Sequence, residues 1–252
     1  MDPQTAHEKL RSRALSLLGI PTSVQGRWTA EAAPRASAEA AADNEVLLYG
    51  PIVDDFKRSF VSYCMDDEEL VVSNKSFRAA MADVRGDVVV RINSPGGDVW
   101  EASGMMTAIT ERRNGGDAVS VVVDGLAASA ASLVMLAAAE IQVAPLASVM
   151  IHQARGLMYG PAPKFLDMAA FLERVDRQAA ELYAARTGMT VDDVLVAIAE
   201  ERWFTGEEAV EAGLADGVIT LIESGAAVDG ETDAELFGGR NLRLAALFGA
   251  AA

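Results

Sequence analysis

Two residues of this chain could together perform acyl transfer, Ser129 and His152. A serine hydroxyl is almost fully protonated at neutral pH, so a serine nucleophile needs a neighbouring base. The chain has only two histidines, and the other one, His7, lies near a polar N-terminus. A serine–histidine mechanism would therefore use His152 as its base. Ser132, one helical turn after Ser129 in the expected helix, is a rival nucleophile.

The same chemistry needs donors for a developing oxyanion. Ser129 is expected where a strand turns into a helix, and there the helix dipole and free N–H groups favour negative charge. Gly96 and Gly97 expose backbone N–H groups with no side chain in the way. One of these, with the N–H of Ala130, would form an oxyanion hole. Taken singly, each residue has an ordinary structural explanation, and His152 could be a plain strand-end histidine. Their order along the chain is what points to catalysis.

Strand–turn–helix units precede and follow these residues. Residues 87–92 form a nearly continuous β-branched run, which suits a strand covered on both faces, and a helix opens at Asp98 after a Gly-rich turn. The pattern repeats with a strand over 118–123, a turn at Asp124-Gly125 and a helix over 129–139. Such units in series predict an α/β fold with a mostly parallel sheet and helical crossovers.

The other expected elements divide the chain into three parts. The predicted strands are 46–49, 141–143, 149–151 and 218–222, and the predicted helices are 73–84, 164–186 and two short ones opening at Thr190 and Thr205. An N-terminal helix (6–19) and a flexible linker make up residues 1–44. We expect the main domain over 45–224 and a weakly patterned tail over 225–252.

Composition excludes several classes of function. The net charge of −16 argues against a nucleic-acid-binding surface and against an anionic membrane. The single cysteine, Cys64, cannot form an intrachain disulfide, and no Cys/His spacing indicates a metal site, so we expect neither metal nor cofactor. The N-terminus does not resemble a signal peptide, and the longest low-polarity run, 126–139, is shorter than the roughly 20 residues needed to span a bilayer. A reducing, cytoplasmic location is expected.

Three segments in this order resemble the signature segments of the Clp-type (caseinolytic) serine peptidases. They are Ile92-Asn93-Ser94-Pro95-Gly96-Gly97, Gly125-Leu126-Ala127-Ala128-Ser129 and Val149-Met150-Ile151-His152-Gln153. The resemblance runs from about Val46 to Ile222. It implies a spiral of β-β-α units, a fold shared with the crotonases, and assembly as a homo-oligomeric ring. Residues 164–186 resemble the long handle helix of that family.

The resemblance also implies roles for individual residues. Ser129 would be the nucleophile and His152 the general base, with the N–H groups of Gly96 and Ala130 as the oxyanion hole. The segment Trp203 to Val210 is similar to the one that follows the family's acid, and it places Glu201 at that position. The family's acid is an aspartate, so Glu201 departs from the pattern, and its longer side chain would shift the geometry. Glu200 is a nearby alternative.

Particular features favour one branch of the family. The long N-terminal extension and the segments 46–52 and 203–209 resemble the Clp-related head maturation proteases of tailed phages, which process scaffold, portal or capsid proteins inside the prohead. The alternative is a proteolytic subunit fed by an AAA+ unfoldase in an ATP-dependent Clp protease. A non-catalytic ring or scaffold protein on the same fold is a third hypothesis, and a crotonase acting on acyl-CoA thioesters is a weaker fourth. A membrane-bound signal-peptide peptidase is disfavoured, because none of the four lysines lies in the motifs.

Overall fold

The computed structural model describes residues 44–59 and 71–220. The chain divides into two compact units, Met1–Ile219 and Thr220–Ala252, and every described residue except Thr220 belongs to the first. The predicted N-terminal helix (6–19), most of the linker, Cys64 and the tail (225–252) lie outside the described residues. The predicted domain limits therefore stay predictions.

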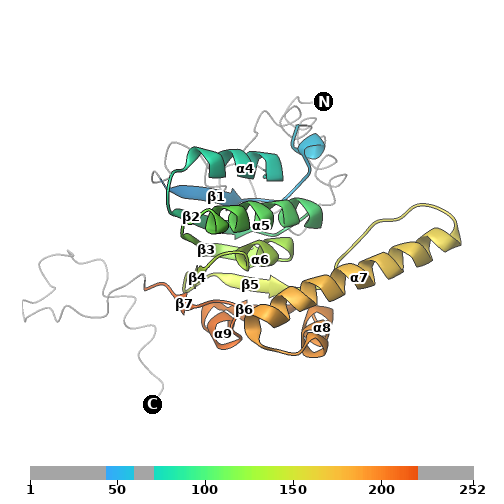
Figure 1. The fold of residues 1–252 in the computed structure, drawn as a ribbon. Coiled ribbons are helices and arrows are strands. Elements are labelled where there is room, and N and C mark those ends of the chain that lie inside the picture. The colour runs from blue at the N-terminus through green and yellow to red at the C-terminus, as the bar shows by residue number, and fades with distance from the viewer. Residues whose placement is uncertain (1–43, 60–70, 221–252) are drawn as a thin grey trace, which may run out of the picture. The chain divides into compact units, whose positions relative to one another are not determined.

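The centre of the described fold is a mostly parallel β-sheet (Figure 1). Its strands are β1 (Glu45–Tyr49), β2 (Val88–Ser94), β3 (Val119–Ala128), β4 (Glu140–Val143), β5 (Ser148–Ile151), β6 (Arg202–Thr205) and β7 (Gly217–Val218). The path runs β1-β2-β3-β4-β7, while β5 pairs with β3 and β6. Only the β5–β6 pair is antiparallel among the described strands. The predicted α/β class with parallel strands is confirmed.

Helices connect and cover these strands. They are α4 (Asn74–Asp83), α5 (Val99–Asn114), α6 (Ala130–Met135), α7 (Ala162–Thr187), α8 (Val191–Ala199) and α9 (Gly206–Glu211). Local sequence sets several of their ends. Asp98 caps α5 by accepting from the N–H groups of Trp100 and Glu101, and Thr205 forms a capping box with Glu208 at the start of α9. Figure 1 shows α4, α5 and α6 in succession beside β1, β2 and β3, which they contact.

The turn predicted at Asp124-Gly125 is wrong, because β3 continues through these residues to Ala128. At this point β3 changes partner, from β4 through Val123 to β5 from Leu126 onward. Asp124 is not a turn residue but an ion-pair partner of Arg91 and an acceptor for the Tyr49 hydroxyl. A turn-like dipeptide thus marks the place where one long strand passes between two partners.

Other boundaries also differ from prediction. Helix α6 is shorter than the predicted 129–139, and β7 ends at Val218. Strand β6 is an element that the pattern did not predict. Strand β2 alternates between buried and half-buried side chains rather than being fully covered on both faces. The β-branched run at 87–92 therefore reflects one core face and one partly covered face.

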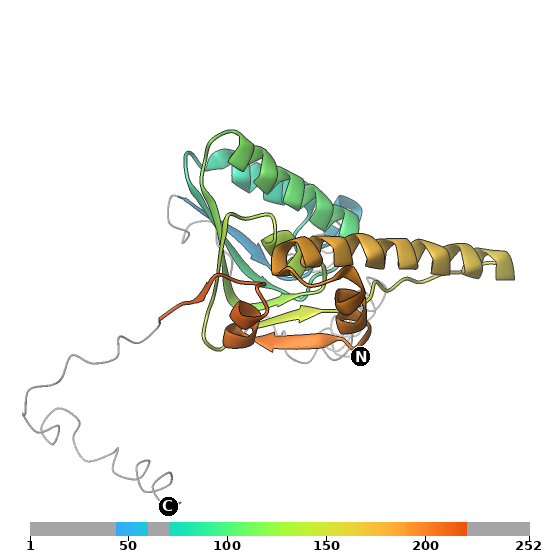
Figure 2. The same cartoon turned by 60° about the horizontal axis from the view of Figure 1, so that its bottom comes forward.

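Helix α7 has two halves with different surroundings. Its buried side chains are Asp176, Ala180 and Tyr183, all in its second half. Its first half extends beyond the sheet in both views (Figures 1 and 2) and exposes Leu166. The predicted long helix over 164–186 is thus present. No helix in the described ranges is both long and apolar enough to cross a bilayer.

Candidate active site

Ser129 occupies the single residue between β3 and α6, in a backbone conformation rare for side-chain-bearing residues. Its φ is 55° and its ψ −126°, and Glu201 is the one other non-glycine residue with positive φ in the described ranges. Strain of this kind persists only when surrounding structure imposes it. Here the Ser129 N–H donates to the Met150 carbonyl oxygen at 2.9 Å, extending the β3–β5 pairing into the turn. The hydroxyl makes no capping bond to α6, so it is free to face another partner.

That partner is His152, which follows the last residue of β5. Its Nε2 lies 2.7 Å from the Ser129 Oγ, within hydrogen-bond distance. Because β3 and β5 are parallel neighbours, their carboxyl ends lie side by side and bring together two residues 23 positions apart in the sequence. The structure thus joins the two residues that the sequence singled out.

The environment of His152 favours the neutral imidazole. Burial lowers its pKa below the usual value, the nearby Arg155 guanidinium lowers it further, and the carboxylates of Glu201 and Asp176 act in the opposite direction. A neutral imidazole can accept a proton at Nε2, provided that the hydrogen sits on Nδ1. That Nδ1 is buried and has no hydrogen-bond partner among the described residues.

Glu201 lies near His152 but is bound elsewhere. Its carboxylate forms a hydrogen-bonded ion pair with Arg155 rather than accepting a hydrogen from His152 Nδ1. The residue lies in the tight connection between α8 and β6, with a φ of 54°. Glu200, the alternative acid, is the exposed C-terminal cap of α8. The assignment of Glu201 as the third catalytic residue therefore stays a prediction.

The two predicted oxyanion donors, the N–H groups of Gly96 and Ala130, differ in the hydrogen bonds that they make. Gly96 packs against the turn at Ser129 so closely that a Cβ on it would lie 2.4 Å from the Ala128 carbonyl oxygen and 2.8 Å from the Ala130 nitrogen. Its own N–H donates to the Ser94 Oγ at 3.1 Å. Ala130 is the first residue of α6, where helix geometry leaves the N–H without an intrahelical acceptor. The Ala130 N–H thus has no acceptor within its helix. The Gly96 N–H would have to give up its hydrogen bond to the Ser94 Oγ before it could bind an oxyanion.

Ser132, the rival nucleophile, is fully buried. Its Oγ donates to the Ser129 carbonyl oxygen at 2.7 Å and lies 2.7 Å from the Tyr183 hydroxyl. Burial raises the pKa of that phenol, so it stays protonated. The hydroxyl of Ser132 is therefore a structural link between α7 and the turn that holds Ser129.

Ser129 and His152 are called the dyad below. Sequence reasoning missed three residues beside it: Arg155, Asp176 and Tyr183. Asp176 accepts from the Ala154 N–H at 2.6 Å, two residues after His152. A signal for it existed, since Asp176 and Tyr183 are seven positions apart and so share one face of α7, where a carboxylate interrupts an apolar stripe. Arg155 had no such signal.

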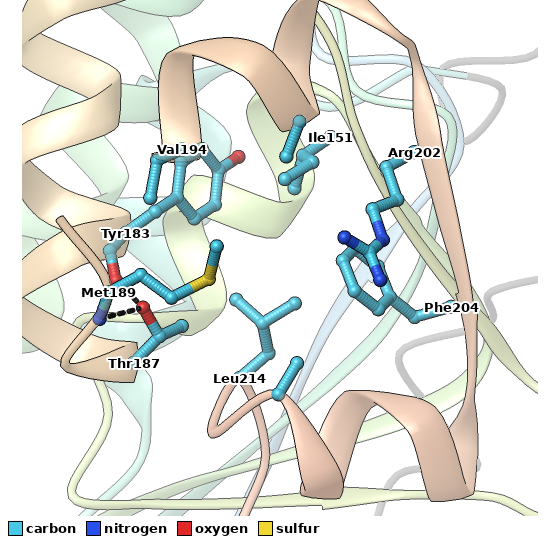
Figure 3. A pocket seen from close by; sticks show the side chains of 10 residues that line it. Ile151, Tyr183, Thr187, Met189, Val194, Arg202, Phe204 and Leu214 are labelled. Carbon is cyan, nitrogen blue, oxygen red and sulfur yellow. Dashed lines mark hydrogen bonds between the residues drawn. The ribbon is translucent and has the colours of Figure 1, made fainter. Parts of the chain in front are cut away.

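A separate cavity of about 220 Å³ lies between β5, β6, α7 and α8 (Figure 3). Tyr183, Thr187 and Met189 line one side, and Arg202 and Phe204 line the other (Figure 3). Neither Ser129 nor His152 contributes to its lining. The cavity is therefore not part of the site formed by the Ser129 hydroxyl and the His152 imidazole.

Comparison with known proteins identifies the family. The sequence model of the family described as Clp protease matches residues 68–221, more than half of the chain. Subunit 3 of the proteolytic part of an ATP-dependent Clp protease from Rhodococcus jostii is 34% identical over 143 residues, which cover 56% of this chain and 69% of that protein.

Two further relatives carry similar names. Proteolytic subunit 2 from Corynebacterium efficiens is 32% identical over 183 residues, covering 69% of this chain and 89% of that protein. Proteolytic subunit 1 from Leifsonia xyli is 31% identical over 155 residues, covering 61% and 77%. Ser129, His152 and Glu201 all lie inside the matched region. The chain therefore belongs to the Clp protease family and is a serine-type peptidase, a hydrolase.

Proposed function

We propose that Ser129 is the nucleophile and His152 the general base of a Clp-type serine endopeptidase. The observation that carries this proposal is the 2.7 Å contact between Ser129 Oγ and His152 Nε2, made by a serine held in a strained turn at a helix start. A hydroxyl in that position faces outward from the turn and has its base already in contact. Family membership favours this chemistry over the crotonase and signal-peptide peptidase alternatives.

The proposed reaction has two halves. Ser129 Oγ attacks the carbonyl carbon of the scissile peptide bond while its proton moves to His152 Nε2. The tetrahedral intermediate collapses, the C–N bond breaks, and His152 returns the proton to the leaving amine. A water then attacks the acyl-enzyme and His152 takes one of its protons. The second collapse returns that proton to Ser129 and releases the new carboxylic acid, which loses the other proton to solvent.

Each tetrahedral intermediate carries a negative oxygen that needs donors. The Ala130 N–H at the start of α6 supplies one, and the Gly96 N–H supplies a second if it releases Ser94. His152 becomes an imidazolium in the same step, so a nearby carboxylate stabilises it. Glu201 could accept from Nδ1 once it separates from Arg155.

The physiological role that the relatives favour is the proteolytic subunit of an ATP-dependent Clp protease, since all three carry that name. Exposed apolar side chains support the expected homo-oligomeric ring. Leu157 and Tyr159 lie in the segment between β5 and α7, and Phe165 and Leu166 lie in the exposed half of α7. Exposed apolar groups concentrated in one stretch are typical of an interaction surface. We expect native mass spectrometry to find an assembly rather than a monomer.

Phage head maturation remains a second proposal, favoured by the resemblance of 46–52 and 203–209 to that branch. The two roles differ in how a folded substrate is handled. Degradation of a folded, tagged protein only with a Clp unfoldase and ATP would support the ATP-dependent subunit. Limited cleavage of capsid, scaffold or portal proteins at defined sites without ATP would support head maturation.

Ser129→Ala tests the shared mechanism. We expect this variant to lose peptide cleavage by at least about 10³-fold and to lose labelling by a fluorophosphonate probe. Ser103→Ala is the matched control, because Ser103 is an exposed serine on α5. Unchanged cleavage by Ser129→Ala would contradict the mechanism. Absence of labelling in the unaltered protein would favour the non-catalytic scaffold hypothesis.

A further inference from the structure

One face of α7 is linked by hydrogen bonds to the segments that carry Ser129 and His152. Tyr183 reaches the nucleophile turn through Ser132, and Asp176 reaches the segment after His152 through the Ala154 N–H. The two side chains are seven residues apart, or about two helical turns. They are 3% and 8% exposed, so both contacts are made in the interior. The handle helix therefore supports the site as well as extending from the body.

The surroundings of Asp176 are unusual for a buried carboxylate. Burying such a charge is costly unless hydrogen bonds or an opposite charge compensate for it. The short bond from the Ala154 N–H, at 2.6 Å, is one compensation. No ion pair of Asp176 is found in the described ranges. A positive charge arising nearby would supply the missing compensation, and the imidazolium of His152 is such a charge.

Glu201 is less suited to that task in this arrangement. Its charge is already paired with Arg155, and the two side chains are 43% and 70% exposed, so solvent and salt weaken their fields. The charged groups that face His152 are Arg155 on its own loop, Glu201 from the α8–β6 connection and Asp176 from α7. Of these, only Asp176 is a buried carboxylate without a cationic partner in the described part of the chain.

We propose that Asp176 is a positioning residue for His152. It holds the segment 152–154 through the Ala154 N–H and supplies the buried negative charge that stabilises the imidazolium during proton transfer. The proposal rests on the proposed roles of Ser129 and His152. It assigns a role in catalysis to α7, a helix that carries none of the three sequence motifs and does not include the predicted acid Glu201.

Asp176→Asn separates the charge from the hydrogen bond, because the amide oxygen can still accept from Ala154. We expect kcat to fall by about 10- to 100-fold, as for other groups that act through a catalytic residue, with KM nearly unchanged. The acid limb of the pH–rate profile should move to lower pH, since Asp176 acts to raise the pKa of His152. Asp176→Glu, which keeps the charge, should restore the acid limb toward its original position.

Asp167→Asn is the matched control. Asp167 lies on the exposed half of the same helix and pairs with Lys164 at 3.3 Å, so the change in charge is the same but far from the buried face. We expect this control to leave kcat and the pH profile unchanged. An unchanged kcat and acid limb in Asp176→Asn would overturn the proposal.

A second variant keeps the proposal testable if Asp176→Asn does not fold. Ala154→Pro removes the N–H that Asp176 accepts and leaves Asp176, Glu201 and Arg155 in place. The proposal predicts that kcat falls by about tenfold or more, because the segment that carries His152 loses its anchor on α7. An unchanged kcat in Ala154→Pro would overturn it.

Titration of His152 by NMR distinguishes failure of this inference from failure of the proposed function. The chain has two histidines, so His7→Gln assigns the His152 imidazole signal. A lowered imidazole pKa in Asp176→Asn supports the electrostatic contact even if the protein proves inactive. If Ser129→Ala abolishes activity but Asp176→Asn leaves the titration and kcat unaltered, the peptidase assignment holds and this inference fails.

Discussion

Ser129 is held by interior contacts, whereas the carboxylate expected beside His152 is held at the surface. On the nucleophile side, the fully buried Ser132 and the nearly buried Tyr183 fix the Ser129 carbonyl. On the acid side, Glu201 pairs with Arg155 in a contact that is largely open to solvent. Buried hydrogen bonds are costly to break and exposed ion pairs are not. Ser129, the proposed nucleophile, is thus fixed by the fold, while Glu201, the predicted acid, is held only by a contact open to solvent.

Substituting Gly96 with alanine should disturb the nucleophile side most severely. The new Cβ would meet the Ala128 carbonyl oxygen at 2.4 Å, and φ at Gly96 is 84°. Since small displacements of a nucleophile are costly, we expect kcat/KM to fall by at least about 100-fold. Peptide hydrolysis and thermal unfolding measure the effects on activity and on stability.

Gly86→Ala is the control for this prediction. Gly86 has a similar φ of 73°, but no atom lies within 4 Å of the position that a Cβ would take there. The variant should lose about 1 kcal/mol of unfolding free energy from the backbone strain alone and keep its activity. Equal activity in the two variants would show that Gly96 is not a close neighbour of the working nucleophile.

Tyr183→Phe should weaken the contacts that hold Ser129, with a smaller effect than Gly96→Ala. It removes the hydroxyl that contacts Ser132 while keeping the ring. We expect a loss of about 1 kcal/mol in the free energy of unfolding and a fall in kcat of no more than about tenfold. Ser103→Ala, which removes the hydroxyl of an exposed serine on α5, should change neither. A Tyr183→Phe protein as stable and active as the parent would refute the supporting link through Ser132.

Arg155→Gln should release the Glu201 carboxylate from its ion pair and so test how the charges around His152 act. Arg155 acts to lower the pKa of His152 and Glu201 to raise it. Removing the arginine therefore raises that pKa and moves the acid limb of the pH–rate profile to higher pH. The change in maximal rate should be small, because an exposed pair contributes only about 0–1 kcal/mol.

Arg78→Gln breaks another exposed pair, with Glu111, and serves as the control. It should leave the acid limb in place. An acid limb that stays fixed or moves to lower pH in Arg155→Gln would contradict the arrangement of charges around His152.

Local sequence predicted the strands and helices around the dyad because periodicity and capping are local properties. The β-branched runs became β2 and β3, and the cap at Asp98 starts α5 as expected. The local pattern was wrong at Asp124-Gly125. This dipeptide is typical of a turn, but its long-range contacts hold it within strand β3. Arg91 and Tyr49 bind Asp124, and a Cβ on Gly125 would lie 2.9 Å from the Asn93 side-chain oxygen.

The sequence by itself determined the family and the α/β class, through three ordered motifs and repeated strand–helix patterns. It singled out Ser129 and His152 because one of only two histidines lies in those motifs. Only the tertiary structure decided what surrounds that pair. The partner of Glu201, the hydrogen bond of Gly96 to Ser94 and the approach of Asp176 depend on how the chain folds around the dyad. Contacts of this kind arise from how β5, α7 and the α8–β6 connection pack against one another, which no local pattern records.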